Sequence, residues 1–547
     1  MVFPAVSRTP PPDIQTTILS TDHAKYSTNL RSAWIWMALY LFLVALGRYF
    51  VSGALEYDEA EQFLHAQFLL PGYGPQPPLF EWIMHALFLI DGTSFLMLLL
   101  FKAALLWIVF WSVGQIFLLL TGREDVAVVA GFAVFLLPIL SWAAPRTLTH
   151  TLLATFFAAL FLLVLLVRAL PDDQAQIGSA SIAPWRSALA LNGWWMAALA
   201  LSAAGALLSK YSMAPVLLIY VLATLSVPAW RSRLWTWHIF AAAGLAGLMV
   251  APHGWWVWTH LQHVRAPIMA KLSAGGAPAG TGFMDSSAAA LLSGLIGFLA
   301  LPMLAWLYLW IWNRIRFGTD DAAPGDSSSE SRPLKRASIA YFAMFALLCL
   351  VIVAGPGSAG FRNRWLTPFL FLLPTAAVMW AARRPHSRAL LTRLAAISRT
   401  LLVVAGIGLV VRGPLNGWLG YPGWANLPID AISHDVKLLT QPSALVLVSN
   451  MQLAGSLEMK LEDRLIFELN SSVVSLVRPL SCELLLIVPE PQDDPTTAET
   501  GRLQERAAIF LKQEESGTIK WVTTRQSHKY RFSDELLDVL YLSAKSC

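Results

Sequence analysis

Long apolar runs recur along most of this chain, and they constrain its fold more than any other feature. Runs of about 20 apolar residues, the length that crosses the hydrocarbon core of a bilayer, follow one another from Ala33 to Trp418. Charged residues make up 13% of the chain and the mean hydropathy is +0.56, whereas roughly 25% of residues are charged in an average soluble domain. The sequence therefore predicts an α-helical integral membrane protein.

The apolar runs predict about eleven transmembrane helices. They lie near residues 33–52, 94–120, 125–142, 148–168, 190–208, 212–229, 236–258, 287–313, 338–355, 364–382 and 400–418. The first 30 residues are polar, and the first apolar run is too long for the apolar region of a cleavable signal. We therefore expect residues 1–30 to be a disordered cytoplasmic tail, followed by a signal-anchor helix and a transmembrane domain over residues 31–418.

The distribution of basic residues predicts the topology. The net charge is +5, but the basic residues cluster in short gaps between apolar runs, a pattern of membrane topology rather than of nucleic-acid binding. With the N-terminus inside, most of these residues fall in cytoplasmic loops: Arg231, Arg233, Arg314, Arg316, Lys335, Arg336, Arg383, Arg384, Arg388, Arg393 and Arg399. The same topology places residues 53–93, which contain no Lys or Arg, in the first extracytoplasmic loop.

The composition changes at two places. Residues 318–334 are rich in Ser, Gly, Pro and Asp, so we expect a flexible cytoplasmic linker. Residues 419–547 predict a small extracytoplasmic α/β domain, with strands at 444–450, 482–490 and 518–524 and an amphipathic helix at 501–516. Three cysteines are present; Cys349 lies in an apolar run, whereas Cys482 and Cys547 are in this domain, and the sequence does not decide whether they pair.

The first outer loop concentrates carboxylates. Glu56, Asp58, Glu59 and Glu61 fall within six positions, and the apolar residues that follow them favour an amphipathic helix on the membrane interface. The prolines of GYGPQPPLFEW predict a rigid turn before a second short helix. Ionisable residues beside hydrocarbon are costly and are retained for function unless they are freely solvated, so this loop is either a candidate catalytic segment or a polar linker.

Some basic residues are exceptions to the topology, because they fall on the outer side. Lys210, in LLSKYSMAP, either extends its ammonium to the interface or binds a ligand, and Arg362 and Arg364 follow glycines that let the backbone approach one. Arg48, Lys102 and Arg146 lie near the same side and are weaker candidates. Carboxylates opposite cations suit a phosphate-bearing lipid held by Lys and Arg beside a carboxylate that acts as general base.

Four motifs in this order resemble the GT-C polytopic glycosyltransferases. They are Asp58-Glu59 after the first span, Gly-Tyr-x-x-x-Pro-Pro-Leu-x-x-Trp at 72–82, Leu-Ser-Lys-Tyr at 208–211, and Arg-Trp-Leu-x-Pro at 364–368. More narrowly, residues 30–420 resemble the bacterial relatives of protein O-mannosyltransferases and of the aminoarabinose transferase that modifies lipid A. This resemblance implies a bacterial inner-membrane enzyme that transfers a sugar from a polyprenyl-phosphate donor to an extracytoplasmic lipid, glycan or protein acceptor.

The resemblance also implies roles for individual residues. Asp58 matches the presumed general base, with Glu59 as its partner or a metal ligand, whereas Glu56 and Glu61 are expected to be solvated flanks. Lys210 and Arg364 match residues that hold the donor phosphate. Further candidates for binding the substrate are Tyr211, Arg362, Arg146 and Gln76. The transfer is expected to invert the anomeric centre, because the acceptor hydroxyl displaces the phosphate directly.

This sequence departs from the family pattern at two positions. His150 stands where many relatives carry an acidic residue, and Gln76 stands where some carry His or Lys before Pro-Pro. His150 either contributes to a site or ends a helix, and a divalent metal ion (Mg²⁺, Mn²⁺ or Zn²⁺) near His150 or Glu59 is compatible with the sequence but not required by it.

A transporter or flippase of lipid-linked sugars is the main alternative function. Transporter sites usually lie at the bilayer midplane on broken helices in repeated halves, but here the ionisable residues gather at one edge and no repeat is evident. His253, next to Pro252 inside a predicted span, is the main exception, and it reads as a packed core residue or a ligand. A scaffold that only displays the C-terminal domain would not explain the opposed charges of the outer loops.

Overall fold

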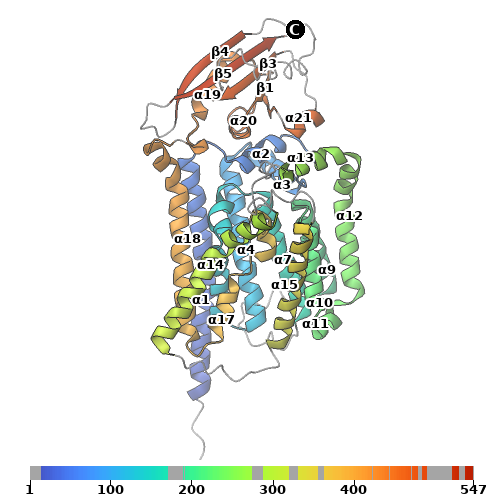
Figure 1. Cartoon of the computed structure of the whole chain (residues 1–547), viewed down its shortest axis with the longest axis vertical. Coiled ribbons are helices and arrows are strands. Elements are labelled where there is room, and N and C mark those ends of the chain that lie inside the picture. Colours follow the sequence, from blue (N-terminus) through green and yellow to red (C-terminus); the bar gives the residue numbers. More distant parts are fainter. Residues whose placement is uncertain are drawn as a thin grey trace, which may run out of the picture.

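The structure is a computed structural model and shows a bundle of long helices capped at one end by a small sheet (Figure 1). It describes residues 14–170, 189, 191–273, 287–318, 331–354, 363–421, 423–442, 444–469, 471–477, 483–489, 520–528 and 536–545. Arg362, Cys482, Cys547 and the predicted helix at 501–516 lie outside these residues, and so does most of the predicted linker at 318–334.

All eleven apolar runs form helices. The long ones are α1 (Ile14–Val51), α4 (Phe95–Thr121), α7 (His150–Ala169), α9 (Asn192–Ser209), α12 (Trp237–Thr259), α14 (Ser287–Phe317), α15 (Ser331–Ala354) and α18 (Ser387–Trp418). Among the described residues, seven helices are long and apolar enough to cross a membrane, and up to nine spans result if each bent pair of helices counts as one. The other two runs correspond to α9 and to a shorter apolar segment at Thr367–Ala382.

Three of the predicted spans are broken rather than straight. The predicted span at 125–142 consists of α5 (Glu124–Ala133), η1 (Val134–Leu136), η2 (Ile139–Ala143) and α6 (Ala144–Arg146). It bends by 79° at Leu137 and Pro138. Helices α10 (Met213–Leu225) and α11 (Pro228–Leu234) are bent by 115°, because Pro228 cannot continue the helix before it. The third comprises η5 (Asn363–Trp365), α16 (Thr367–Leu370) and α17 (Thr375–Ala382).

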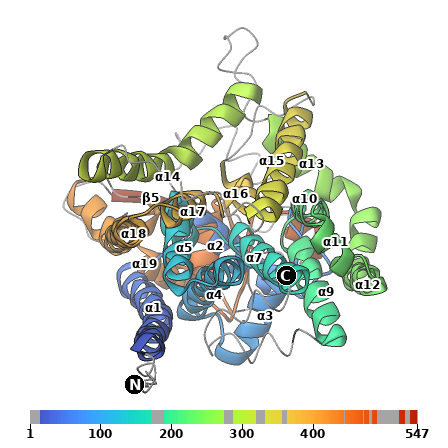
Figure 2. The ribbon, with the colours of Figure 1, turned by 90° about the horizontal axis from the view of Figure 1, so that it is seen from below.

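The bundle encloses a large apolar core that extends over most of these helices. Seen from the end opposite the sheet, α4, α5 and α7 lie inside, and α12 and α14 run along the periphery (Figure 2). Large apolar side chains remain exposed on the outer helices, for example Trp258 and Ile315. Exposed apolar surface of this kind is what a bilayer covers, which agrees with a multi-pass membrane protein.

The first outer loop forms two short helices, as predicted. Helix α2 (Tyr57–Ala66) and helix α3 (Leu79–Asp91) are joined by the proline-containing turn and lie between the bundle and the sheet (Figure 1). Asp58 and Glu59 are in the first turn of α2, where carboxylates interact favourably with the helix dipole. Gly72 is required in the turn because a Cβ atom there would lie 2.2 Å from the Trp256 ring.

The C-terminal domain is a five-stranded mixed sheet in the order β2-β1-β3-β5-β4. Its elements are η6 (Trp424–Asn426), α19 (Ile429–Leu439), β1 (Leu445–Val448), α20 (Met451–Glu458), β2 (Leu465–Glu468), α21 (Ser472–Val477), β3 (Glu483–Pro489), β4 (Lys520–Ser527) and β5 (Leu536–Lys545). Strand β1 pairs in parallel with β2 and β3 (Leu445 opposite Leu465 and Leu484), and β5 runs antiparallel to β3 and β4. The central strands are buried on both faces, which explains their continuous apolar sequences.

The C-terminal domain is connected to the last helix of the bundle and also packs directly on the first outer loop. Helix α20 lies against α2, and a Cβ atom at Gly455 would lie 2.5 Å from the Ala60 backbone. The Leu55 amide donates to Ser456 Oγ at 2.9 Å, and Gln67 Nε2 donates to the Ile466 carbonyl at 2.9 Å. The sheet domain therefore fixes the position of α2, which carries the candidate base.

Three expectations about chain segments were wrong. Residues 14–30, expected to be a disordered tail, continue α1 as helix, since no proline interrupts the chain between Asp13 and Val51. The end of the predicted linker, from Ser331, is the first turn of α15. Strands β2 and β5 were missed because β2 has four residues and β5 follows a charged segment, which weakens the alternating pattern of a strand.

Candidate active site

The structure brings Asp58, Lys210 and Arg364 together, although they lie far apart in the sequence. Arg364 Nη1 donates to Asp58 Oδ2 at 3.3 Å, and their side chains are 26% and 19% exposed, so both can be reached from outside the protein. Lys210 lies close enough that the charges of Asp58 and Arg364 both act on it. Sequence motifs on three helix ends thus converge on one site.

Lys210 occupies the break between α9 and α10. Its side chain is buried and its Nζ donates to Thr151 Oγ1 at 2.8 Å, so it does not extend to the interface as the alternative interpretation supposed. Burial lowers the pKa of Lys210 to about 7, and the nearby Arg364 charge adds to this effect. An ammonium with few neighbouring carboxylates is well suited to bind an anion.

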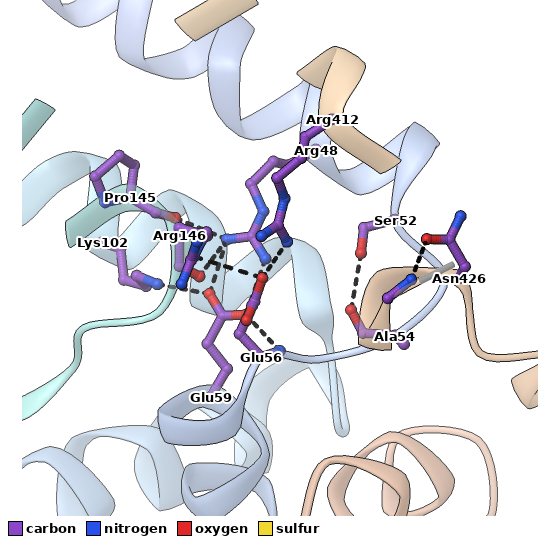
Figure 3. Close-up of polar contacts among 11 residues, drawn as sticks. Arg48, Ser52, Ala54, Glu56, Glu59, Lys102, Pro145, Arg146, Arg412 and Asn426 are labelled. Carbon is purple, nitrogen blue, oxygen red and sulfur yellow. Dashed lines mark hydrogen bonds and ion pairs between the residues drawn. The ribbon is translucent and has the colours of Figure 1, made fainter. Parts of the chain in front are cut away.

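Glu59 points from α2 towards Arg48 and Lys102 of the bundle (Figure 3). Its carboxylate accepts two bonds from Arg48, at 2.8 and 2.9 Å, and one from Lys102 Nζ at 2.5 Å. Burial opposes its ionisation, but the Arg48 and Lys102 charges outweigh burial and hold the pKa of Glu59 at about 2. These contacts favour a structural ion pair over the expected catalytic or metal-binding role, and they place Arg48 and Lys102 in the same pair.

Glu56 is not the solvated flank that the sequence suggested. Its carboxylate pairs with Arg412, and Arg146 Nε lies 3.6 Å from the same oxygen, Oε1 (Figure 3). Arg412 is near the end of α18 that faces the sheet domain. The sequence could have indicated it, because it is a basic residue at the predicted outer end of the last span, against the positive-inside rule.

Glu81 is a further buried carboxylate that the sequence interpretation did not select. Its Oε1 lies 3.2 Å from His150 Nε2 and 3.6 Å from His65 Nδ1. Burial opposes its ionisation, but His150 and His65 outweigh burial and hold the pKa of Glu81 at about 2. His150 also contacts Gln62 at 3.2 Å. His150 therefore pairs with a carboxylate on α3.

The remaining candidates occupy the surroundings of this site. Tyr211 stacks on His253 and contacts it at 3.2 Å, and His253 Nδ1 lies 2.8 Å from the Pro71 carbonyl, so His253 links α12 to the proline turn as a packed residue. Gln76 is half-buried in the turn between α2 and α3. In the part of the chain that the structure describes, no group of three or more His, Cys, Asp or Glu side chains is arranged to hold a metal ion.

Comparison with characterised proteins identifies two glycosyltransferases. The chain is 29% identical over 442 residues to the lipopolysaccharide core galacturonosyltransferase RgtA of Rhizobium johnstonii, which covers 80% of this chain and 81% of that protein. It is 28% identical over 434 residues to RgtB of the same organism, also named a lipopolysaccharide core galacturonosyltransferase, with coverage of 78% and 81%. No protein-family model matches the chain.

Comparison with solved structures identifies the fold. ArnT from Cupriavidus metallidurans bound to undecaprenyl phosphate aligns with a TM-score of 0.55 at 14% identity, over 94% of this chain and 98% of that one. The apo form of the same protein aligns with a TM-score of 0.53 at 13% identity over the same shares. Together with the eleven helical segments, the helices of the first loop and the convergence of the sequence motifs, these comparisons show that the chain is a multi-pass membrane glycosyltransferase with a GT-C-like helical fold.

Proposed function

We propose that this protein transfers a uronic acid, of the galacturonic acid class, from a polyprenyl-phosphate donor to the lipopolysaccharide core on the outer face of the bacterial inner membrane. The sugar and the acceptor follow the names of the two relatives, and the donor lipid follows the undecaprenyl phosphate bound to ArnT. We place the N-terminus in the cytoplasm and the C-terminal domain outside, in accordance with the positive-inside rule.

The single observation that carries this proposal is the convergence of Asp58, Lys210 and Arg364. In the proposed reaction, Asp58 accepts the proton of the acceptor hydroxyl as its oxygen attacks the anomeric carbon. The bond between that carbon and the phosphate oxygen breaks, and polyprenyl phosphate leaves with the electron pair. This direct displacement inverts the anomeric centre. Lys210 and Arg364 stabilise the negative charge on the leaving phosphate.

The contact between Asp58 and Arg364 fits this sequence of events. An arginine that binds Asp58 Oδ2 at 3.3 Å holds the carboxylate in position before substrate arrives. When the donor binds, its phosphate competes with Asp58 for the guanidinium, which leaves the carboxylate available to the acceptor hydroxyl. The two substrates would therefore assemble the site together.

The experiment uses the purified full-length chain, polyprenyl-phosphate galacturonic acid and a lipopolysaccharide acceptor, with product detected by mass spectrometry. We expect Asp58→Asn to reduce kcat by a factor of about 10² or more, the size of a lost general base, with little change in donor binding. Glu61→Gln on the same helix is the matched control and should retain activity. Undiminished transfer by Asp58→Asn would remove Asp58 from this role.

A further inference from the structure

The six charged residues around the N-terminal turn of α2 do not balance. Arg48, Lys102, Arg146 and Arg412 supply four positive charges, whereas Glu56 and Glu59 supply two negative ones (Figure 3). We refer to these six residues as the α2 charge cluster. In the regions that the structure describes, it therefore carries two positive charges in excess.

The excess charge is presented on one side of the cluster. Glu59 is saturated by the buried Arg48 and Lys102, and Arg48 is further satisfied by the carbonyls of Pro145 and Arg146, at 2.7 and 2.8 Å. Arg146 and Arg412, in contrast, share the single carboxylate of Glu56, and their side chains are 31% and 27% exposed.

The Arg146 side chain is also incompletely satisfied. Among the residues whose positions the structure describes, its buried Nε atom has no hydrogen-bond partner, because Glu56 Oε1 is 3.6 Å away. A buried N–H group without an acceptor is destabilising, and an added anion would supply that acceptor. Two guanidinium groups facing one site match the geometry of a phosphate or a carboxylate.

This arrangement lies beside the proposed base but is distinct from the donor site. Glu56 is two residues before Asp58, and the Asp58 carboxylate accepts a hydrogen bond from Arg364, which is outside the cluster. We propose that Arg146 and Arg412 bind an anionic group of the acceptor, a phosphate or a sugar carboxylate, while its hydroxyl reaches Asp58. This inference rests on the proposed function, since it assigns the second substrate of the same reaction.

Binding of acceptor can be measured without donor, which separates this inference from the proposed chemistry. The probes are a glycolipid with one phosphate monoester, the same glycolipid after phosphatase treatment, and the same glycolipid with a glucuronic acid in place of the phosphate. Their dissociation constants are measured by native mass spectrometry of the full-length protein in nanodiscs. We expect at least one anionic probe to bind about tenfold more tightly than the neutral one, and the better probe identifies phosphate or carboxylate as the recognised group.

Two variants of the cluster change this preference in opposite directions. Arg412→Gln should abolish the preference for the anionic probe, whereas Glu56→Gln releases both arginines and should increase it. A merely structural role of the cluster would lower binding in both variants. Arg399→Gln, on the same helix as Arg412 and in contact with the Phe132 ring, is the matched control and should keep the wild-type preference.

Two outcomes of these binding measurements would contradict the proposed anion site. Equal binding of all three probes by the wild-type protein, or an unchanged preference in Arg412→Gln, overturns it. If Arg412→Gln does not fold, Glu56→Gln still decides, because a preference that falls in that variant has the wrong sign. Anionic preference without any sugar transfer would refute the proposed function but leave this binding site intact.

Discussion

Replacing Glu59 by glutamine tests the physical reasoning behind the α2 charge cluster. The substitution keeps the shape of the side chain but leaves Arg48 and Lys102 buried without their counter-charge. Removing one partner of a buried ion pair costs about 3–5 kcal/mol. The lowered pKa of Glu59, about 2 in place of its usual value near 4.5, corresponds to a contribution of roughly 3 kcal/mol at neutral pH, so the two routes agree.

The pH dependence of this contribution has a definite sign. Because the pKa is lower in the folded protein than in the unfolded chain, the stabilisation is fully present above about pH 4.5 and is lost as the pH falls towards 2. Glu59→Gln should therefore lower the thermal unfolding temperature at pH 7 and abolish the part of the acid sensitivity that comes from this carboxyl.

The assay is thermal unfolding of the detergent-solubilised protein, followed by intrinsic tryptophan fluorescence between pH 2 and 8. Glu61→Gln is the matched control on the same helix, and surface substitutions of that kind usually change stability by no more than about 0.5 kcal/mol. If Glu59→Gln unfolds at the same temperature as Glu61→Gln at pH 7, the cluster does not stabilise the fold and the argument fails.

Two further predictions concern the donor site and the C-terminal domain. With a pKa of about 7, Lys210 is charged below pH 7 and neutral above it, so kcat/KM for the donor should fall as the pH rises through 7. The Lys210→Arg variant stays charged and should flatten that profile. An identical profile in both proteins would exclude Lys210 as the titrating group. Gly455→Ala should lower both the activity and the unfolding temperature, because the new Cβ atom would lie 2.5 Å from the Ala60 backbone. Gly247→Ala is the control and should lower neither, because its Cβ atom would lie in open space. Equal behaviour of the two variants would show that close packing of α20 on α2 is dispensable.

Much of the site could be predicted from the sequence, because its chemistry is carried by residues that are unusual in their surroundings. A carboxylate beside an apolar run, a lysine between two spans and an arginine after glycines are each costly in a membrane protein, so they indicate Asp58, Lys210 and Arg364 without a structure. The role of each depends on which partner it faces, and the sequence does not contain that information.

Glu59 and Glu56 illustrate the difference. Both belong to the same acidic run as Asp58, but the helical rotation of α2 directs Glu59 to Arg48 and Lys102, Asp58 to Arg364, and leaves Glu56 at the N-terminus of the helix with Arg412. The pairing partners come from α1, α4, η5 and α18. The separation of residues along the chain predicts none of these contacts. The roles predicted for Glu59 and Glu56 from the sequence were therefore wrong or incomplete.

The sequence by itself determined that the chain crosses a membrane many times, where its helices lie, and that its ionisable residues gather at one end. These properties follow from local composition, because the length and polarity of a segment decide whether hydrocarbon accepts it. The tertiary structure alone decided which charges meet and how the C-terminal sheet packs on the first outer loop. The physical reason is that ion pairs and close packing depend on distances of a few ångströms between segments hundreds of residues apart, which only the folded chain sets.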